Sequence, residues 1–149
     1  MTSLMLGCAS TPVAVAPVGP NPNGALSSTA EGQLEVYSAL IPHTEGNNPT
    51  WYQHADYRIY DQRGKLVAHV DNTLGHYARS PRPVSLPPGN YIVRAAAEDY
   101  LSVKVPVVIA PGRVTRVHLD DAWRPVNVRR TELVSLPAGN PVGWSPAAK

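Results

Sequence analysis

Phenylalanine is absent from the 149 residues of the sequence, and cysteine occurs once, as Cys8. The apolar core must therefore be built from Leu, Val, Ile and the seven Tyr. A single thiol fits an oxidising compartment, where spare thiols are a liability. No apolar run approaches the ~18 residues that a membrane-spanning helix needs, so the sequence excludes a helical transmembrane protein.

Charge is also sparse and nearly balanced, with 13 basic and 11 acidic residues and a net charge of +2. Proteins that bind nucleic acid concentrate basic residues on one face. Only Arg129 and Arg130 stand together here, without comparable neighbours. The sequence therefore excludes nucleic acid as a partner.

Helical segments are missing as well, because 16 Pro and 11 Gly interrupt the chain throughout. Val, Ile, Thr and Tyr instead cluster in short runs of alternating polarity, which is typical of strands. We therefore predict an all-β protein. Seven such runs are separated by turn residues within residues 32–120, at 33–40, 55–61, 65–70, 83–86, 90–97, 101–109 and 113–119.

Strands at this spacing predict a seven-stranded antiparallel β-sandwich. Pro106 lies inside the sixth run and lacks an N–H group, which indicates an edge position or a bulge. The continuous apolar residues 107–109 favour instead a strand that is covered on both faces. The sequence leaves both possibilities open.

Residues 86–119 repeat a known order of parts: a Pro-Gly turn, a Tyr-X-Val strand, an aromatic corner, a Val-rich strand, a second Gly turn and a closing strand. This order resembles the carboxypeptidase-regulatory, transthyretin-like and PEGA families. The resemblance implies a transthyretin-like sandwich and a non-catalytic module used for spacing, adhesion or sugar contact. This sequence departs from the family pattern at Asp99, where glycine is usual. The matching parts are Pro88-Gly89, Tyr91, Val93, Tyr100, Val103 to Ile109, Gly112, and Val114 to Leu119.

The N-terminal residues Met5-Leu6-Gly7-Cys8 resemble a bacterial lipobox, which implies that Cys8 is lipidated. The apolar stretch is short and no Lys or Arg precedes it, so we expect residues 1–8 to be a truncated signal whose true start lies upstream. A lone incidental thiol is the alternative. Lipidation implies a bacterial cell-envelope protein anchored in the outer membrane or at the periplasmic face.

The segments on both sides of the 32–120 domain lack its regular pattern. Residues 9–31 are rich in Pro, Ala and Ser, which predicts a disordered tether that holds the domain some tens of Å from a membrane. Residues 121–149 should form a C-terminal extension with at most one edge strand, ELVSL. We expect Trp123 and Trp144 to cap the core rather than bind a ligand.

Two nearly identical segments, VSLPPGN at 84–90 and VSLPAGN at 134–140, indicate a strand end stopped by Pro and turned by Gly-Asn. We expect Gly89 to adopt a positive φ and to set the register of the following strand. Substitution of Gly139 should matter much less, because the tail supports little core.

Candidate binding residues gather in two loops. Loop 41–54 carries Trp51 and Tyr52 beside two Asn, a mixture suited to protein or glycan contact. The alternative is that these two rings begin a strand and pack inward. Loop 74–83 is the second candidate. The predicted binding residues are Trp51, Tyr52, His54, His76 and Tyr77.

No motif predicts catalysis, a metal or a cofactor. His54, Asp56 and His76 are natural metal ligands, but the HxxxH and HxH spacings are absent, as is the G-x-S-x-G motif of hydrolases. We therefore expect a non-enzymatic envelope lipoprotein that serves as a structural or binding module. An accessory subunit of a larger envelope machine is the main alternative, and a metal-dependent hydrolase is a weaker one.

Overall fold

The computed structural model describes residues 13–24, 26–72, 81–98 and 100–146, so Cys8, His76 and Tyr77 lie outside the described residues. Regular structure in these ranges is almost entirely β, with one 3-10 turn, η1 (Arg130–Glu132). The prediction of an all-β protein is therefore confirmed.

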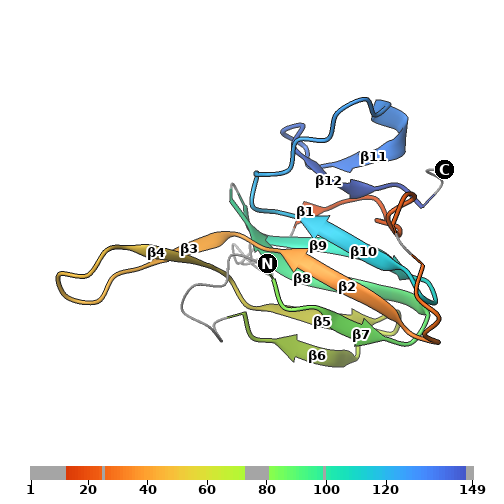
Figure 1. Ribbon diagram of the computed structural model, residues 1–149, viewed down its shortest axis with the longest axis horizontal. Coiled ribbons are helices and arrows are strands. Elements are labelled where there is room, and N and C mark those ends of the chain that lie inside the picture. Colours follow the sequence, from red (N-terminus) through yellow and green to blue (C-terminus); the bar gives the residue numbers. More distant parts are fainter. Residues whose placement is uncertain (1–12, 25, 73–80, 99, 147–149) are drawn as a thin grey trace, which may run out of the picture.

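Two sheets make up the body of the domain (Figure 1). All seven runs that were predicted as strands form strands in these sheets. The larger sheet has five strands in the order β1-β9-β8-β5-β6, with bounds β1 (Val13–Ala14), β5 (Tyr57–Asp61), β6 (Leu66–Val70), β8 (Gly89–Ala97) and β9 (Tyr100–Ile109). The smaller sheet has three strands in the order β10-β2-β7, with bounds β2 (Gly32–Tyr37), β7 (Val84–Leu86) and β10 (Val114–His118).

The antiparallel part of the prediction is wrong for one pair of the predicted strands, because β10 runs parallel to β2; β1, which was not predicted, also runs parallel to its partner β9. The turn at Gly112 explains the first pair. It carries the chain from β9 in the larger sheet to β10 in the smaller one, instead of folding β10 back onto β9. Gly112 has φ +66°, and a Cβ there would collide with the backbone oxygen of Ser27, so only glycine fits.

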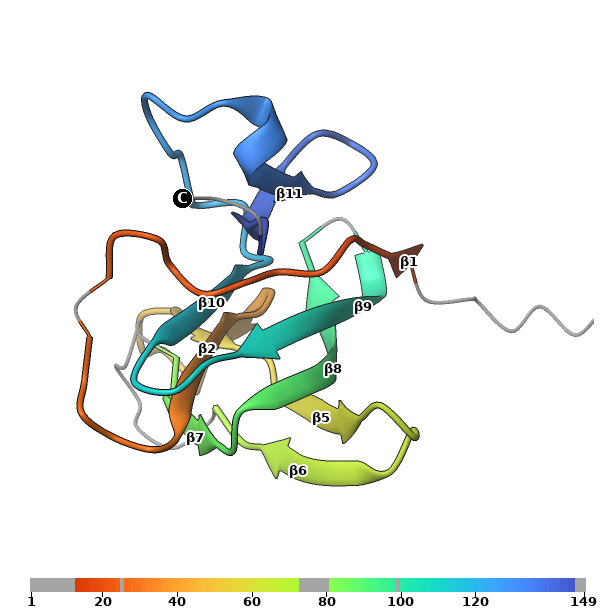
Figure 2. The same cartoon turned by 90° about the vertical axis from the view of Figure 1, so that its right-hand side faces the viewer.

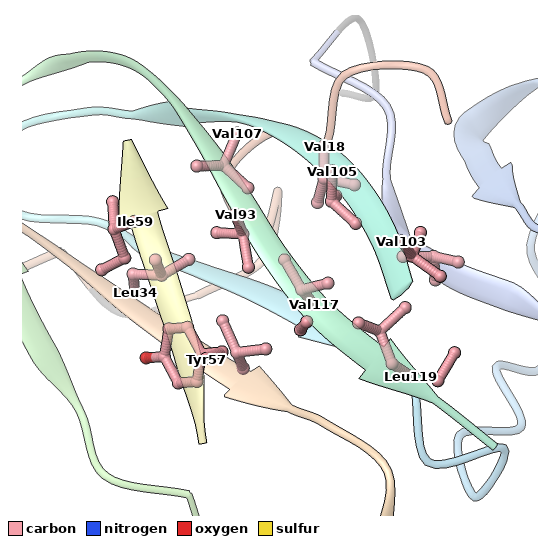
Figure 3. Packing of buried hydrophobic residues seen from close by; sticks show 14 of the residues in the cluster. Val18, Leu34, Tyr57, Ile59, Val93, Val103, Val105, Val107, Val117 and Leu119 are labelled. Atoms are coloured by element: carbon pink, nitrogen blue, oxygen red, sulfur yellow. The ribbon is translucent and has the colours of Figure 1, made fainter. Parts of the chain in front are cut away.

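The inner faces of the two sheets enclose one apolar core (Figure 3). Alternation along β9 turns every second side chain inward, and Leu34 of β2 and Val117 of β10 face them from the other sheet. Valine dominates this core in the absence of phenylalanine, and burying each side chain stabilises the fold by about 1.5–3 kcal/mol. The inward residues of β9 are Val103, Val105, Val107 and Ile109.

The N-terminal segment is part of the fold, so the prediction of a disordered tether is wrong for its described residues (Figure 2). Val13 and Ala14 pair with β9, and Val18 is fully buried in the core. The Val18 N–H donates to the carbonyl of Pro106 (2.8 Å), and the Val108 N–H donates to the carbonyl of Val18 (2.9 Å). This segment, residues 13–24, is called the strap below.

The strap also explains how Pro106 fits in the middle of β9. The Pro106 carbonyl accepts from the strap, and in an extended strand the N and C=O of one residue point to the same side. The missing N–H therefore faces the strap, and β9 keeps its pairing with β8 at the Ile92–Pro106 position. Strand β9 has a partner on each side, and the partner at Pro106 is irregular.

The C-terminal residues form a hairpin rather than the single edge strand that was predicted. Strands β11 (Leu133–Ser135) and β12 (Pro141–Trp144) pair antiparallel above β10 (Figure 1). Val134, Leu136 and Val142 are buried with the main core. This hairpin is joined to the strap, because the Gly19 N–H donates to the Trp144 carbonyl (2.7 Å).

Loop 41–54 is also a hairpin, built from β3 (Leu40–His43) and β4 (Trp51–His54). It projects away from the two sheets, with residues 44–50 at its tip (Figure 1). Its base is fixed by the Leu40 N–H, which donates to the Glu98 carboxylate (2.8 Å).

Candidate functional site

The projecting hairpin places the predicted binding residues Trp51 and Tyr52 on opposite faces, because successive side chains of a strand alternate. Trp51 is half-buried and stacks on His43 with 5.7 Å between ring centroids. Tyr52 lies opposite Pro42 and is 55% exposed. The two rings therefore do not share one contact surface.

His54, the third predicted binding residue, lies in the interior. Its side chain is buried, and its Nδ1 lies 2.6 Å from the backbone oxygen of Ser38. Neighbouring Asp56 points elsewhere, toward His69, with 3.7 Å between Oδ2 and Nε2. Within the described part of the chain no three His, Cys, Asp or Glu side chains gather as a metal site would require. His54 orders the base of the hairpin.

A different set of rings, which sequence reasoning did not bring together, forms an aromatic column on the outer face of the smaller sheet. Tyr37 of β2 stacks on His118 of β10 with centroids 4.6 Å apart, and His118 stacks on Trp123 at 4.5 Å. The interplanar angles are 16° and 15°, so the imidazole is held between two nearly parallel rings. Trp144 of β12 meets Trp123 edge to face at 6.0 Å and 64°.

Local sequence and register together produce this column. Tyr37 and His118 follow the buried Val36 and Val117, so alternation turns both rings outward, and the parallel register places them side by side. The chain then reverses at Asp121, whose φ of +57° suits an aspartate. This reversal brings Trp123 back over the free face of His118.

Beside the column lies a surface cleft with a volume of about 640 Å³. The column and Trp144 form one side of its lining, residues 21–23 of the strap form another, and residues 125–128 complete it. Its charged side chains are Arg116 and Glu132. The cleft is therefore assembled from four distant parts of the chain.

Electrostatics keep the column uncharged at neutral pH. Burial between the two rings and, to a smaller extent, the nearby Arg116 guanidinium together lower the pKa of His118 to about 4. Burial also raises the pKa of Tyr37. The Arg116 charge is balanced by Glu35 of the adjacent strand, with 2.9 Å between Nε and Oε2.

Trp123 and Trp144 were expected to cap the core, and the structure places both as lining residues of the cleft. Alternation alone marks Tyr37 and His118 as outward-facing residues of their strands. Their meeting depends on the parallel pairing of β2 with β10, which is a property of the tertiary fold and leaves no local trace in the sequence.

Comparison with known proteins gave no match to a family model, to a curated protein or to a solved structure. Among the residues that the structure describes, no helix is long and apolar enough to cross a membrane. A functional proposal for this chain therefore rests on its own residues.

Proposed function

We propose that this chain is a non-enzymatic lipoprotein of the bacterial envelope whose β domain is a binding module. The observation that carries the binding role is the cleft beside the aromatic column. Its rings are fixed by stacking on one another, and its wall is completed by the strap that leads from the anchor. Concave sites lined by aromatic side chains with a few polar groups are typical of ligand binding.

The anchoring part of the proposal rests on the lipobox-like residues before Cys8 and on the short distance from Cys8 to β1. Only residues 9–12 separate Cys8 from Val13, the first residue that the structure describes and the start of β1. Fully extended, these residues span at most about 14 Å. A lipid on Cys8 would therefore hold the domain close to the membrane surface, in place of the long tether that the sequence suggested.

The proposal includes the family resemblance, with a transthyretin-like arrangement of the seven strands of residues 32–120 that lie in the two sheets. Its support is the order of turns and strands from Pro88 to Leu119 and the packing of the two sheets over one core. The chain differs from a purely antiparallel sandwich in two ways: β2 pairs with β10 in parallel, and the strap adds β1 beside β9.

Labelled palmitate tests the anchoring. The chain is expressed in a bacterial host with a complete signal sequence ahead of residue 1, and both lipid incorporation and membrane fractionation are measured. Wild type should carry label and partition into detergent, whereas Cys8→Ser should do neither. Equal labelling of wild type and Cys8→Ser would show that Cys8 is not the lipidated residue.

The role of an accessory subunit is a second candidate, favoured by the projecting β3–β4 hairpin. Ile41 is 45% exposed and Tyr52 is 55% exposed on opposite faces of this hairpin. A photo-crosslinking amino acid at Tyr52 should then capture a discrete envelope protein in cells. The control position is Leu66 in β6, which is 50% exposed on the body of the domain. Identical crosslinking at both positions would argue against this role.

The metal-dependent hydrolase is the least favoured alternative. Its best candidate residues, His54 and Asp56, contact different neighbours in the structure. His76 lies outside the described residues.

A further inference from the structure

The cleft beside the aromatic column has the size of a small-ligand site, since its volume of about 640 Å³ lies within the usual range of 300–1,000 Å³. Its rings are already in place. Tyr37 and Trp123 hold His118 between them, and Trp144 stands at 64° to Trp123, so the two indoles form a rigid corner. A ligand would lose little affinity to the ordering of these side chains.

The lining carries little net charge. Arg116 is paired with Glu35, the imidazole between the rings is neutral at pH 7, and Glu132 is the acidic residue of the lining. A phosphate or another strongly anionic ligand would lack a free cationic partner, and a cationic ligand would face Arg116. The charge pattern therefore favours a neutral ligand.

The polar groups of the lining include three side-chain amides. Asn21 and Asn23 of the strap and Asn127 of the opposite loop line the cleft. Each amide offers two N–H donors and a carbonyl acceptor. A sugar hydroxyl also donates and accepts, and the C–H face of a sugar ring packs against indole. Amides and indole rings in one cleft match both properties of a sugar.

From these observations we infer that the cleft binds a neutral oligosaccharide, with a sugar ring in the corner of Trp123 and Trp144 and its hydroxyls on Asn21, Asn23 and Asn127. This inference names the ligand class of the proposed binding role, and it does not depend on the lipid anchor.

A proline-rich peptide is the ligand that the observations favour less. Such peptides dock on aromatic rings whose faces lie open along a groove. Here Tyr37 and Trp123 cover both faces of His118, and Trp144 meets Trp123 at an angle. The cleft offers a corner with amides around it instead of a row of open faces.

Titration calorimetry with the full chain at pH 7 tests the inference. The probes are the trisaccharides cellotriose, maltotriose and chitotriose, and the peptide probe is decaproline. At least one trisaccharide should bind, and its affinity should be insensitive to added salt because no ion pair forms. Binding of decaproline alone, or of none of the trisaccharides, would overturn the inference.

The matched variants are Trp123→Ala in the cleft and Trp51→Ala on the projecting hairpin. Trp123→Ala should weaken trisaccharide binding at least tenfold, and Trp51→Ala should leave it unchanged. Equal effects of the two substitutions would place the sugar elsewhere and overturn the assignment.

A second pair guards against loss of folding in Trp123→Ala. Asn23→Ala changes an exposed amide of the cleft, and Asn47→Ala changes an exposed amide at the tip of the hairpin. Urea unfolding verifies that both remain folded. Only Asn23→Ala should reduce affinity, about threefold to tenfold. A failure of these tests leaves the labelling of Cys8 unaffected, so the two proposals fail separately.

Discussion

The segments VSLPPGN at 84–90 and VSLPAGN at 134–140 differ at one residue, yet they build different connections. The first connects β7 in the smaller sheet to β8 in the larger sheet, so the chain passes from one sheet to the other. The second joins β11 to β12 and closes a hairpin within one two-stranded sheet. Nearly identical sequences therefore form a connection between two sheets in one place and a hairpin turn in the other.

The single difference, Pro88 against Ala138, explains the two outcomes. The Gly139 N–H donates to the Leu136 carbonyl (2.8 Å), which closes a β-turn over Pro137 and Ala138. Ala138 has a negative φ, so this turn is of type I. A proline at the Ala138 position would disfavour the helical region that the turn requires at Pro137, and by the same rule Pro88 disfavours such a turn in the first segment.

The residues that follow reinforce the difference. Tyr91 continues into β8, which pairs with β5 on one side and β9 on the other. Pro141 stands at the first position of β12, where a missing N–H is tolerated, and the β11–β12 pairing shifts register beside it. A short motif thus predicts where a strand ends, and the residues within and after the motif decide where the chain goes next.

The largest effect is expected from the buried leucines of the two segments. Leu86 and Leu136 are 4% and 6% exposed, and both belong to the same core. Leu86→Ala and Leu136→Ala should each lower the free energy of unfolding by about 2–5 kcal/mol. Urea unfolding measures both losses. A loss confined to Leu86→Ala would show that the tail supports little core, as the sequence suggested.

The next effect concerns the turn itself. Ala138→Pro recreates the first segment in the second position, and it should destabilise the hairpin by about 1–3 kcal/mol through backbone strain. The reciprocal change, Pro88→Ala, removes a constraint on the unfolded chain and should cost less than about 1 kcal/mol. Thermal melts of the two variants compare them directly. Equal losses would show that Pro88 and Ala138 do not decide the two connections.

Substitution of the two turn glycines should give losses of stability that are similar to each other. Gly89 has φ +153° and Gly139 has φ +102°, and no atom lies within 3.4 Å of a Cβ added at either position. Strain in the backbone is therefore the main cost, about 1–3 kcal/mol for alanine. The positive φ expected at Gly89 is present, whereas the lesser importance expected at Gly139 does not follow from its geometry. Urea unfolding of Gly89→Ala and Gly139→Ala measures the two losses. Equal losses would contradict the sequence-based expectation that Gly139 matters less than Gly89.

The sequence was informative wherever local pattern determines structure. Alternating residues located the seven strands of residues 32–120 that lie in the two sheets but missed β3 and β4, and the absence of phenylalanine correctly implied a core of Val, Leu, Ile and Tyr. Alternation works here because each strand has one face on the core.

Sequence reasoning failed where burial depends on a distant partner. The strap is rich in Pro and Ala, so its composition suggested disorder. Val18 is nevertheless buried, because it pairs with the edge of β9 and because Gly143 of β12 has no side chain to occupy the same space. A Cβ at Gly143 would lie within 2.5 Å of Val18 Cγ1, so the small residue is required. The cleft was missed for the same reason, since its lining comes from four separate parts of the chain.

The smallest effect on stability at neutral pH is expected from His118. Its ring stacks on Trp123, and Trp123 contacts Trp144 of the C-terminal hairpin, which contains the second segment. Its folded pKa of about 4 lies below the ordinary value of 6.5, so the unfolded chain binds the proton more tightly. The stability that neutral His118 contributes is therefore complete above about pH 6.5 and is lost as the pH falls toward 4.

His118→Gln should remove this part of the acid sensitivity, because glutamine carries no titrating group. Thermal melts of wild type and His118→Gln between pH 7 and 4 measure it, with His69→Gln as a control. His69 is exposed, on the body of the domain and away from the column. The curves of wild type and His69→Gln should fall together below pH 6.5, and that of His118→Gln should fall less. If all three curves fall in parallel, protonation of His118 is not a cause of the loss of stability in acid.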